Sequence, residues 1–532
     1  MLSPVNVLIG FLWFISALID YADFCAIWQL KEYRRDRFRD FISTDQGRRY
    51  FFRFSLLYRF FGFFIAILWP INDASHLKNI FLSILILDIL FAIFRFFVKR
   101  LKRPIFTSKA LGIIFASLLF ESFIFFLIRD WSLPFFLFLS RFFILTFFVG
   151  LFEFPTRMTK KIIIDRAIKK MKKFPNVKVI GITGSYGKSS VKEFTAHLLS
   201  QKYRVMKTPK NINSEIGIAK FILSTNFSDI DFFVVEMGAY KTGEIALICK
   251  MVHPSIGVLT AIAEQHLALF GSIKNIQSAK YELLRSIPSD GFIITNADNP
   301  YCMELLKTLN CQNIETFGTD DENTPTCLTT NIESTKTGTN FEGIYRGNRG
   351  KILTPVIGAH HAYNIAPAAI LAIRFGLSKE QIEHGCATLP TDIHGSLHLF
   401  SYGKAQIIDD SYNSNPQGFK SALDVLSSFP SHKKRIVITR GMIELGERSN
   451  ELHEKIGEEI AFTADELIVI TKDFFDSLKR GVGQKYRTQI LLKEKPSELL
   501  DYVRVLKEQD CVILLESRIP AQVYSEITEK KV

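Results

Sequence analysis

The stretch VKVIGITGSYGKSSVKEFTAHLLSQ, residues 177–201, decides the fold of the larger part of the chain. Residues 177–183 form a β-branched run, residues 184–190 are rich in glycine and serine, and the remainder has the composition of a helix. A strand that leads through a glycine-rich loop into a helix directs backbone N–H groups and the positive end of the helix dipole at phosphate. The stretch therefore predicts an α/β domain with a phosphate-binding loop.

The residue types in this loop suit a nucleotide site. Gly184 and Gly187 let the backbone approach the phosphates, Lys188 neutralises their charge, and the Ser189 hydroxyl is a possible ligand of Mg²⁺. The loop departs from the strict P-loop pattern, because Ile182 stands where that pattern has glycine. The residues predicted to hold the phosphates of ATP are Gly184, Ser185, Gly187, Lys188, Ser189 and Ser190.

Further ionisable side chains follow predicted strands downstream of the loop. Residues 230–237 (IDFFVVEM) predict a buried strand that carries Glu236 at its end, where α/β folds place residues that face a ligand. Glu236 is therefore a candidate Mg²⁺ ligand, directly or through water. His266 follows the next strand and Lys280 lies fourteen residues later. Considered alone, His266 is interpreted as a structural residue, and Lys280 is interpreted as a solvated residue of a helix.

The first 154 residues differ in composition from the rest of the chain. They hold 32 of the 49 phenylalanines and contain repeated runs of 15–20 residues with at most one charge. A soluble protein has difficulty burying such a load, so a wholly soluble protein is excluded. Five apolar segments, each near the ~20 residues that cross a bilayer core, are predicted at 4–19, 54–72, 79–98, 110–128 and 131–152.

Lysine and arginine counts predict the orientation of these segments. Eight, five and eight basic residues lie in the predicted loops 20–53, 99–109 and 157–173, whereas 73–78 and 129–130 have one each. Five spans with the basic loops inside give a multi-pass protein of the inner membrane. Its N-terminus is expected outside, and everything after residue 153 is expected in the cytoplasm with access to ATP.

Net charge and cysteine content limit the other functions. The total of +13 comes from residues 1–173, which carry +14, while the remaining 359 residues carry −1. A nucleic-acid-binding domain would have its own basic face, so no nucleic acid partner is expected. The seven cysteines include no C-x-x-C pair, which argues against a disulfide framework or a cysteine zinc site and favours a reducing compartment.

Charges inside the predicted membrane region need an explanation, because they are costly in hydrocarbon. Arg59, Asp88, Glu121 and Arg141 lie near the middle of predicted spans. Pairing of the arginines with the acids is the favoured interpretation, and a site for lipid phosphate is the other. Residues 158–173 (MTKKIIIDRAIKKMKK) are compatible with an amphipathic helix on the inner leaflet or with a solvated linker helix.

Eight motifs occur in the order seen in the Mur ligases, and the chain resembles this family over about residues 175–520. The motifs are TGSYGKSS (183–190), TPKNINSEIG (208–217), VVEMGAYKTGEI (234–245), AEQHLALFGSIKNIQSAKYELL (263–284), NADNP (296–300), GAHHAYN (358–364), IDDSYNSNPQG (408–418) and GMIELGERSNELH (441–453). Within the family, the resemblance is greatest to the ligases that add D-alanyl-D-alanine to a cell-wall precursor peptide.

The resemblance implies a reaction and a set of site residues. Family members form an acyl phosphate from a carboxylate and ATP, and an amine then displaces the phosphate to give an amide. By resemblance, Ser189 and Glu236 bind one Mg²⁺, His266 serves a second, and Lys280 is carbamylated by CO₂, which turns a cation into an anion that supports metal binding. The implied catalytic residues are Lys188, His266 and Lys280; the implied nucleotide contacts are Asn296, His360, Asn364 and Asp410; and the implied substrate contacts are Asn211, Asn213, Tyr412 and Asn415.

The chain departs from the family pattern at several positions. Ser396 follows Gly395 where the family usually has arginine, which puts one phosphate-facing charge in doubt. Ser214 replaces the second asparagine of an N-x-N-N loop, residues 440–442 have Arg-Gly-Met in place of Gly-Asp-Met, and residues 515–518 have Leu-Glu-Ser-Arg in place of Lys-Gly-Ser-Arg. The small domain that grips the UDP end of the substrate has no counterpart, and the predicted spans occupy its place.

The sequence thus predicts a helical membrane bundle followed by α/β domains. The expected parts are a transmembrane region (1–155), a basic linker or amphipathic helix (156–175), a central ATP-binding domain with a P-loop ATPase-like parallel sheet (176–395), and a smaller Rossmann-like α/β domain (396–532). The predicted function is a membrane-anchored, Mg²⁺- and ATP-dependent amide ligase acting on a UDP- or lipid-linked cell-wall precursor and an amine such as D-alanyl-D-alanine. The alternatives are a poly-γ-glutamate-type ligase, a ligase for lipid-linked precursors, and an inactive nucleotide-binding scaffold of the envelope.

Overall fold

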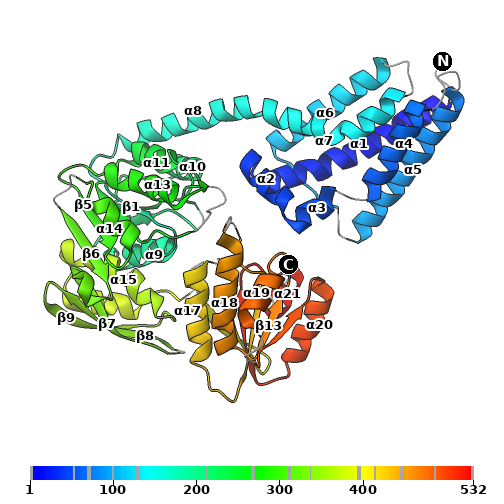
Figure 1. The fold of residues 1–532 in the computed structure, drawn as a ribbon. Helices are drawn as coiled ribbons and strands as arrows, with labels where there is room; N and C mark the ends of the chain where they lie inside the picture. Colours follow the sequence, from blue (N-terminus) through cyan, green and yellow to red (C-terminus); the bar gives the residue numbers. More distant parts are fainter. Residues whose placement is uncertain are drawn as a thin grey trace. The chain divides into compact units, whose positions relative to one another are not determined.

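The structure is a computed structural model and forms two compact units, Met1–Lys161 and Ile162–Val532 (Figure 1). The described residues are 4–51, 54–68, 74–98, 101–127, 132–210, 212–264, 270–309, 313–335, 337–391, 397–412, 415–443, 445, 448–483 and 487–528.

The N-terminal unit is helical, as its apolar composition predicts. Its first helix runs to Leu30, well beyond the predicted span end at residue 19, because Asp20 and Asp23 are buried in ion pairs with arginines. The basic loop predicted from residue 20 therefore starts later and contains two short helices. The bounds are α1 (Pro4–Leu30), α2 (Arg35–Ser43), α3 (Asp45–Phe51), α4 (Phe54–Leu68), α5 (Ala74–Phe97), α6 (Ser108–Leu127), α7 (Ser132–Leu151) and α8 (Glu153–Met171).

Four helical segments in the described residues are long and apolar enough to cross a membrane, where the sequence predicts five. They are Pro4–Leu30, His76–Phe97, Ser108–Leu127 and Leu133–Met171. The remaining predicted span corresponds to α4, whose 15 residues give a length of about 22 Å against a hydrocarbon core of about 30 Å. Residues 69–73, at the end of that predicted span, lie outside the described part of the chain.

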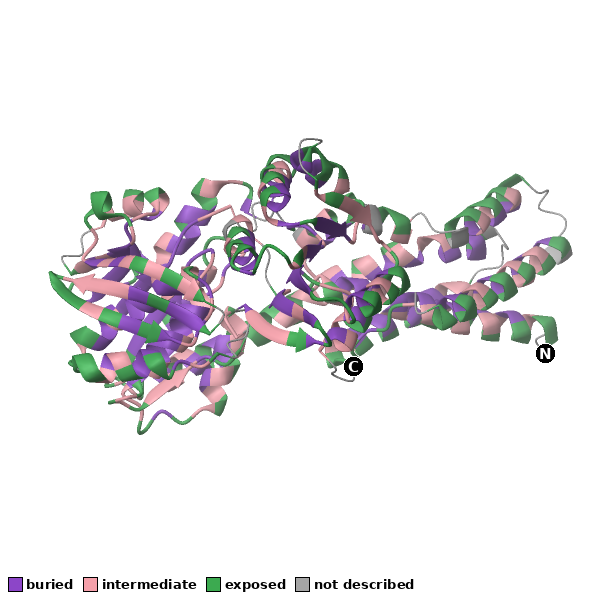
Figure 2. Ribbon diagram, turned by 90° about the horizontal axis from the view of Figure 1, so that it is seen from below, coloured by how far each residue is buried: buried purple, intermediate pink, exposed green. Residues whose placement is uncertain are grey.

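The outer faces of these helices expose large apolar side chains. Phe61, Phe123 and Phe143 are each about two-thirds exposed, while Trp13, Phe81 and the other core residues are buried. Figure 2 shows buried, intermediate and exposed positions alternating along these helices. An apolar surface of this extent is typical of a contact with lipid or protein. The buried arginines face acids: Arg59 Nη2 lies 2.6 Å from Asp88 Oδ1, and Arg141 Nε lies 2.9 Å from Glu121 Oε1. Pairing is confirmed, which leaves the lipid-phosphate interpretation without support.

Helix α8 contributes to both units, because the boundary between them falls within it. Ile164, Ala167 and Met171 are buried in the core of the second unit, together with residues of its sheet. The Lys170 ammonium also donates a 3.0 Å hydrogen bond to the Leu223 carbonyl. The apolar stripe of residues 158–173 therefore packs on the α/β domain, and neither the inner-leaflet helix nor the solvated linker helix is confirmed.

The central domain contains a sheet of nine strands within the described residues, in the order β2-β3-β1-β4-β5-β6-β7-β8-β9. The strands from β2 to β7 pair in parallel. Bounds are β1 (Lys178–Thr183), β2 (Val205–Lys207), β3 (Phe232–Glu236), β4 (Ile256–Leu259), β5 (Phe292–Asn296), β6 (Ile314–Gly318), β7 (Cys327–Thr335), β8 (Gly338–Tyr345) and β9 (Asn348–Thr354).

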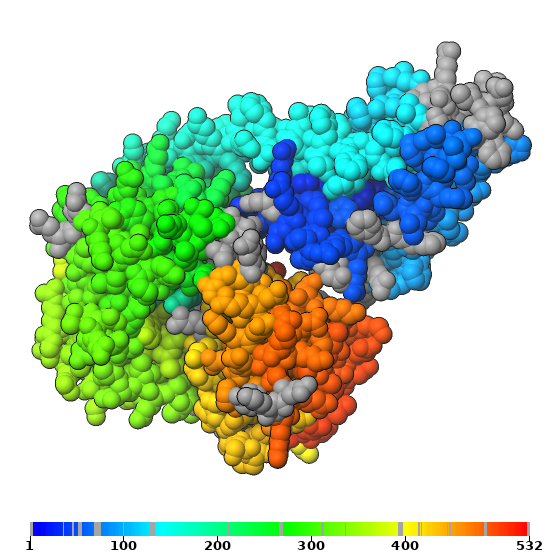
Figure 3. Space-filling view, viewed as in Figure 1, coloured from blue at the N-terminus to red at the C-terminus, as the bar shows by residue number. Residues whose placement is uncertain are grey.

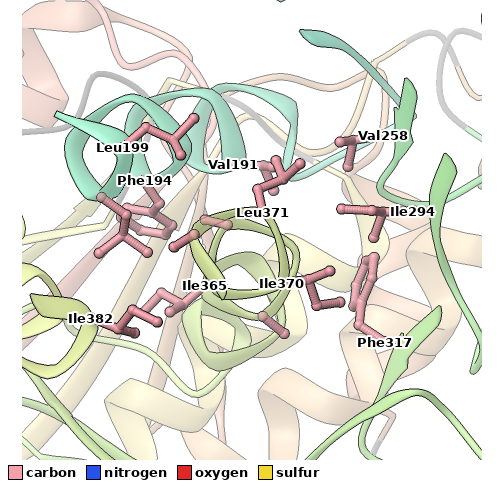
Figure 4. Packing of buried hydrophobic residues seen from close by; sticks show 14 of the residues in the cluster. Val191, Phe194, Leu199, Val258, Ile294, Phe317, Ile365, Ile370, Leu371 and Ile382 are labelled. Carbon is pink, nitrogen blue, oxygen red and sulfur yellow. The ribbon is translucent and has the colours of Figure 1, made fainter. Parts of the chain in front are cut away.

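Helices cover both faces of the parallel part, because its strands are apolar on both sides. Alternate residues of one strand enter different cores: Ile180 packs under α9 and α15, whereas Val179 packs under the helices of the other face. Figure 4 shows Leu371 of α15 beside Val191 of α9, while Ile370 points toward Ile294 and Phe317 of the sheet. The helices are α9 (Lys188–Leu199), α10 (Glu215–Ser224), α11 (Glu244–Val252), α13 (Ile273–Arg285), α14 (Pro300–Leu306), α15 (His360–Arg374) and α16 (Lys379–Ala387), with a 3-10 turn at Asp321–Asn323.

The sheet differs from the predicted parallel sheet at one end. Strands β7, β8 and β9 form an antiparallel meander, which appears in yellow-green at the edge of the domain in the space-filling view (Figure 3). Short connections join these strands, and only antiparallel neighbours can be joined that way. Burial alternates along β7, with Cys327 and Thr329 buried at its start and Asn331, Glu333 and Thr335 exposed toward its end.

The C-terminal domain has a separate sheet of six strands among its described residues, in the order β10-β11-β15-β12-β13-β14. Only the β10–β11 pair is antiparallel there, and cores on both faces lie under helices, as expected for an α/β domain. The bounds are β10 (His398–Tyr402), β11 (Ala405–Asp410), β12 (Lys434–Thr439), β13 (Glu466–Val469), β14 (Gln489–Leu492), β15 (Cys511–Glu516), α17 (Pro416–Ser427), α18 (Ser449–Thr463), α19 (Phe475–Val482), α20 (Pro496–Leu506) and α21 (Ala521–Ile527).

Candidate nucleotide and metal site

The phosphate loop connects β1 to α9 and has room for glycine alone at two positions. Gly184 has φ +152° and Gly187 has φ +79°. A Cβ atom on Gly184 would lie 2.0 Å from Thr260 Oγ1, and one on Gly187 would lie 2.5 Å from Asn364 Oδ1. Both the backbone conformation and the close neighbours therefore require glycine, and Asn364 of α15 lies beside Gly187 of the loop.

Hydrogen bonds to the segment after β4 hold the loop in place. The Ser185 N–H donates to Ala261 O at 2.7 Å, its hydroxyl donates to Ala263 O at 3.0 Å, and the Ala263 N–H donates to that hydroxyl at 2.9 Å. The Thr260 hydroxyl donates to the Tyr186 carbonyl. Ser185 thus acts as an anchor of the loop, while Ser190 lies buried in the first turn of α9.

Lys188, the first residue of α9, bends back over the loop. Its ammonium donates to Gly184 O at 2.6 Å and to Ser185 O at 3.0 Å. Burial lowers the pKa of this amine, and the charge of Glu236 opposes the shift. The amine therefore lies at the mouth of the phosphate-binding turn, as expected for a group that contacts terminal phosphates.

Glu236 ends β3 beside the loop and is 3% exposed. Its backbone N–H donates to Thr208 Oγ1 at 3.1 Å, and its Oε1 accepts from Asn213 Nδ2 at 3.1 Å. Burial acts to raise the pKa of this carboxyl, but Lys192, Lys188 and hydrogen bonds from Asn213 and Ser189 outweigh burial and lower it. The carboxylate and the Ser189 hydroxyl are adjacent oxygen donors of the kind that Mg²⁺ prefers, so these residues fit the metal.

Lys192 belongs to this site although the sequence analysis did not single it out. It is 2% exposed, and its Nζ lies 3.2 Å from Glu236 Oε2 and 3.4 Å from Glu193 Oε1. Its position four residues after Lys188 places both lysines on one face of α9. That spacing was the only signal in the sequence, because its partner Glu236 comes from a distant strand.

Lys280 is buried in α13 rather than solvated. Burial lowers the pKa of its amine well below the usual value, and the charge of Lys188 lowers it further, while Glu244 and Glu282 oppose the shift. The interpretation as a solvated helix residue is wrong, because the apolar face of α13 carries this lysine into the interior. A neutral amine is the form that reacts with CO₂.

Other predicted nucleotide contacts surround the carboxyl end of β5 and the start of α15. Asn296 Oδ1 accepts from the Asp298 N–H at 2.9 Å. A cavity of about 470 Å³ follows directly, lined by Ala297, Asp298, Pro300, Met303, Glu304, Lys307 and Asn323. His360 Nδ1 is buried without a hydrogen-bond partner among the described residues, and burial lowers the pKa of this ring to about 4. A neutral imidazole with an unused nitrogen suits a contact to an uncharged ligand group.

The predicted C-terminal residues have different surroundings. Burial, with the charge of Asp409, raises the pKa of Asp410 to about 7, and its strand partner across β11–β15 is Glu516. Tyr412 is 42% exposed, and burial followed by the charge of Glu236 raises its pKa. Asn415 Oδ1 accepts from the Gly418 N–H at 2.9 Å and caps α17. Asn211, His266 and Ser396, also singled out from the sequence, lie outside the described residues.

Family models match both domains that carry these residues. The Mur ligase middle domain matches residues 182–372, and the Mur ligase, glutamate ligase domain matches residues 398–518. The chain is 31% identical over 318 residues to the UDP-N-acetylmuramoyl-tripeptide–D-alanyl-D-alanine ligase of Escherichia coli strain K12, which covers 59% of this chain and 69% of that relative. The chain belongs to the Mur ligase family. Membership makes this Mur ligase an ATP-dependent, ADP-forming ligase by class.

Other relatives give the same family with partial coverage. The Bacillus subtilis enzyme of the same name is 30% identical over 285 residues, 53% of this Mur ligase and 60% of the relative. The structure of MurF from Thermotoga maritima in complex with ADP is 25% identical with a TM-score of 0.59, covering 70% of this chain and 83% of that one. A MurF from Acinetobacter baumannii shares the fold, with a TM-score of 0.62, 23% identity and coverage of 70% and 80%.

Proposed function

We propose that this Mur ligase forms an amide between a carboxyl-bearing cell-wall precursor and an amine such as D-alanyl-D-alanine. The observation that carries the proposal is that Lys188, Ser189 and Glu236 lie close together at the phosphate loop. Lys188 and Ser189 begin α9, and Glu236 ends β3 beside them. The relatives named above act on a UDP-linked muramoyl tripeptide and D-alanyl-D-alanine by their names. Those names suggest the substrates, and the Thermotoga maritima complex suggests the nucleotide.

In the proposed reaction, the substrate carboxylate attacks the terminal phosphorus of ATP, giving an acyl phosphate and ADP. The amine then attacks the acyl carbon, phosphate leaves, and the amine loses a proton as the amide forms. Lys188 contributes a positive charge where negative charge develops on the transferred group. The glycines of the loop admit the phosphates, and Ser189 with Glu236 would hold Mg²⁺, which supplies further charge stabilisation when bound.

We further propose that Lys280 is carbamylated. Its amine nitrogen would attack CO₂, form a C–N bond and release one proton, which converts a buried amine into a carboxylate-like group. The lowered pKa of Lys280 supports this step, because only the uncharged amine is nucleophilic. With His266, the product would provide ligands for a second Mg²⁺.

We also propose that the N-terminal unit anchors the ligase in the inner membrane, with the α/β domains in the cytoplasm. The exposed apolar faces of its helices and the four segments of spanning length support this location. A membrane anchor favours one variant of the function, in which the carboxyl substrate is lipid-linked, because substrate and enzyme then share one bilayer at high effective concentration. That variant is the second candidate.

Phosphate release from full-length protein in detergent tests the function. The reactions contain ATP, Mg²⁺, D-alanyl-D-alanine and either the UDP-linked or the lipid-linked muramoyl tripeptide, with each substrate omitted in turn. Release that needs both carboxyl donor and amine is expected. Lys188→Ala should lower it by on the order of 10²-fold or more, whereas Lys250→Ala, on an exposed position of α11, should not. Phosphate release that does not depend on the carboxyl donor and the amine, or that Lys188→Ala leaves unchanged, contradicts the proposal.

A further inference from the structure

A chain of five alternating charges runs through the interior of the N-terminal unit. Glu121 Oε1 accepts from Arg141 Nε at 2.9 Å, and Arg141 Nη1 donates to Asp20 Oδ2 at 3.0 Å. Asp20 Oδ2 also lies 2.8 Å from Arg59 Nη2, which donates to Asp88 Oδ1 at 2.6 Å. The members come from α6, α7, α1, α4 and α5, so every apolar helix of the unit contributes one.

Uncharged side chains complete the network. The Ser16 hydroxyl accepts from Arg141 Nη1 at 2.6 Å and donates to Asp88 Oδ2 at 2.7 Å, which links Arg141 directly to Asp88 at one end of the chain. Tyr21 donates to Glu121 Oε2, and Tyr58 donates to Asp88 Oδ1 at 2.5 Å. The two guanidinium groups also lie against the Phe138 ring, at 4.1 and 4.6 Å from its centroid.

The charges in this network do not balance. Three carboxyl groups, Asp20, Asp88 and Glu121, face two guanidinium groups among the described residues, which leaves one negative charge in excess when all are ionised. The five residues are between 0% and 7% exposed. An uncompensated buried charge is so unfavourable that the group takes up a proton instead. The five side chains are buried inside the bundle itself, so the excess charge is unfavourable whether or not lipid surrounds the outer faces.

The contacts single out the carboxyl group that holds the proton. Asp20 contacts both arginines, and Asp88 accepts from Arg59 twice and from two hydroxyls. Glu121 has one guanidinium N–H and the Tyr21 hydroxyl. The titratable and charged groups that face Glu121 are Arg141 on α7 and Asp20 and Tyr21 on α1. Glu121 is therefore the least compensated of the three acids.

We propose that the N-terminal unit is a proton-binding site, with one exchangeable proton held at Glu121 through the charge chain of the five helices. Protonated, Glu121 donates from Oε2 to the Tyr21 oxygen and still accepts from Arg141 at Oε1. The remaining network then has two acids and two arginines. The described residues include no group of three or more acids, histidines or cysteines placed to hold a metal ion.

Infrared spectroscopy of full-length protein tests the proposal, in a detergent that lacks carbonyl groups. A carboxylic-acid C=O band is expected at neutral pH, and labelling glutamate with ¹³C at the side-chain carboxyl should shift it. The label separates Glu121 from buried aspartates such as Asp410. At high pH the proton leaves, the excess charge returns to the bundle, and the unfolding temperature of the N-terminal unit should fall.

Two variants distinguish this proton from a passive ion-pair network. Glu121→Gln should remove the band and keep the fold, because the amide copies the protonated acid. Asp20→Asn should also remove the band although Glu121 remains, because two acids and two arginines then balance without a proton. Absence of the glutamate band in the wild type, or its persistence in Glu121→Gln, would overturn the proposal. A wild-type unfolding temperature that depends on Na⁺ rather than on pH would do the same.

Discussion

At the residue scale, three lysines lie in or near the phosphate loop, and two of them, Lys192 and Lys280, are buried. Lys188 bends over the phosphate loop, Lys192 pairs with Glu236 and Glu193, and Lys280 lies deep in α13. Neighbouring cations in a buried site disfavour one another's charge. Lys192 is paired with Glu236 and Glu193. The positive charge of Lys188 lowers the pKa of the Lys280 amine, and the charges of two glutamates oppose this shift. Burial thus lowers the pKa of the Lys188 amine and lowers that of the Lys280 amine well below its usual value, which favours the uncharged form of Lys280.

Replacement of Lys280 by arginine tests its proposed carbamate. Lys280→Arg should lower phosphate release by on the order of 10²-fold, since a guanidinium group keeps its charge and forms no carbamate. Initial rates in buffer depleted of CO₂, with and without added bicarbonate, provide the measurement. Bicarbonate should restore the wild type and leave the variant unchanged. The control is Lys250→Arg, and normal turnover of Lys280→Arg contradicts the carbamate.

Local sequence was enough to predict part of this site. The glycines, Lys188 and Ser189 act within one short loop whose geometry follows from a strand, a turn and a helix. Glu236 was predicted because strand ends collect at one sheet edge. The roles of Lys192 and Lys280 depend on burial by segments far away in the chain. Asn415 was expected near the substrate, and the structure shows it as a helix cap, a role that its position before Pro416 already favours.

At the element scale, α8 shows how one apolar stripe can be covered in different ways. Ile164, Ala167 and Met171 repeat at helical spacing, and that pattern predicts a buried face without identifying what covers it. Burial in a lipid leaflet and burial in a domain core are both compatible with this pattern. The antiparallel meander β7–β9 escaped prediction for a related reason, because alternating, half-buried strands do not show in the sequence which neighbour they pair with.

Two isoleucines of α8 provide a matched test of its packing. Ile164 is 6% exposed and Ile162 is 50% exposed in the same helix. Ile164→Ala should lower the free energy of unfolding by about 2–4 kcal/mol, because it opens a cavity in the core. Ile162→Ala should change it by less than about 0.5 kcal/mol. Thermal and denaturant unfolding of the full-length variants in detergent is the measurement. Equal effects at both positions would mean that this face of α8 is not the buried one.

At the scale of the whole molecule, an α/β ligase and a helical bundle share one chain. The composition of the first 154 residues predicted this division, and the family match begins only at residue 182. The number of membrane crossings does not follow directly from composition. Helix α4 is shorter than its neighbours, but it supplies Arg59 to the interior of the bundle. A helix that contributes a buried charge belongs to the bundle whatever its length.

Reporter fusions test the number of crossings. If α4 crosses with the other four apolar helices, a reporter at the C-terminus reports the cytoplasm and one at the N-terminus reports the exterior. The basic residues that precede α4 and follow α5 and α7 favour this result. Two fusions that report the same side would show an even number of crossings and remove α4 from the count. A C-terminal reporter outside would contradict access to ATP.

The charge chain also has a consequence for how the protein is made. If the N-terminal unit is anchored in the membrane as proposed, its apolar helices would enter the bilayer in turn during synthesis, and a charge at the centre of one costs about 2.5–3.5 kcal/mol on insertion scales. The acid Asp20 on α1 finds its second arginine only when Arg141 on α7 has been synthesised, about 120 residues later. We therefore expect early helices to remain in a protected, incompletely inserted state at the translocon until α7 arrives. A truncated chain would display orphan charges in the bilayer, the kind of feature by which membrane quality control recognises unfinished proteins.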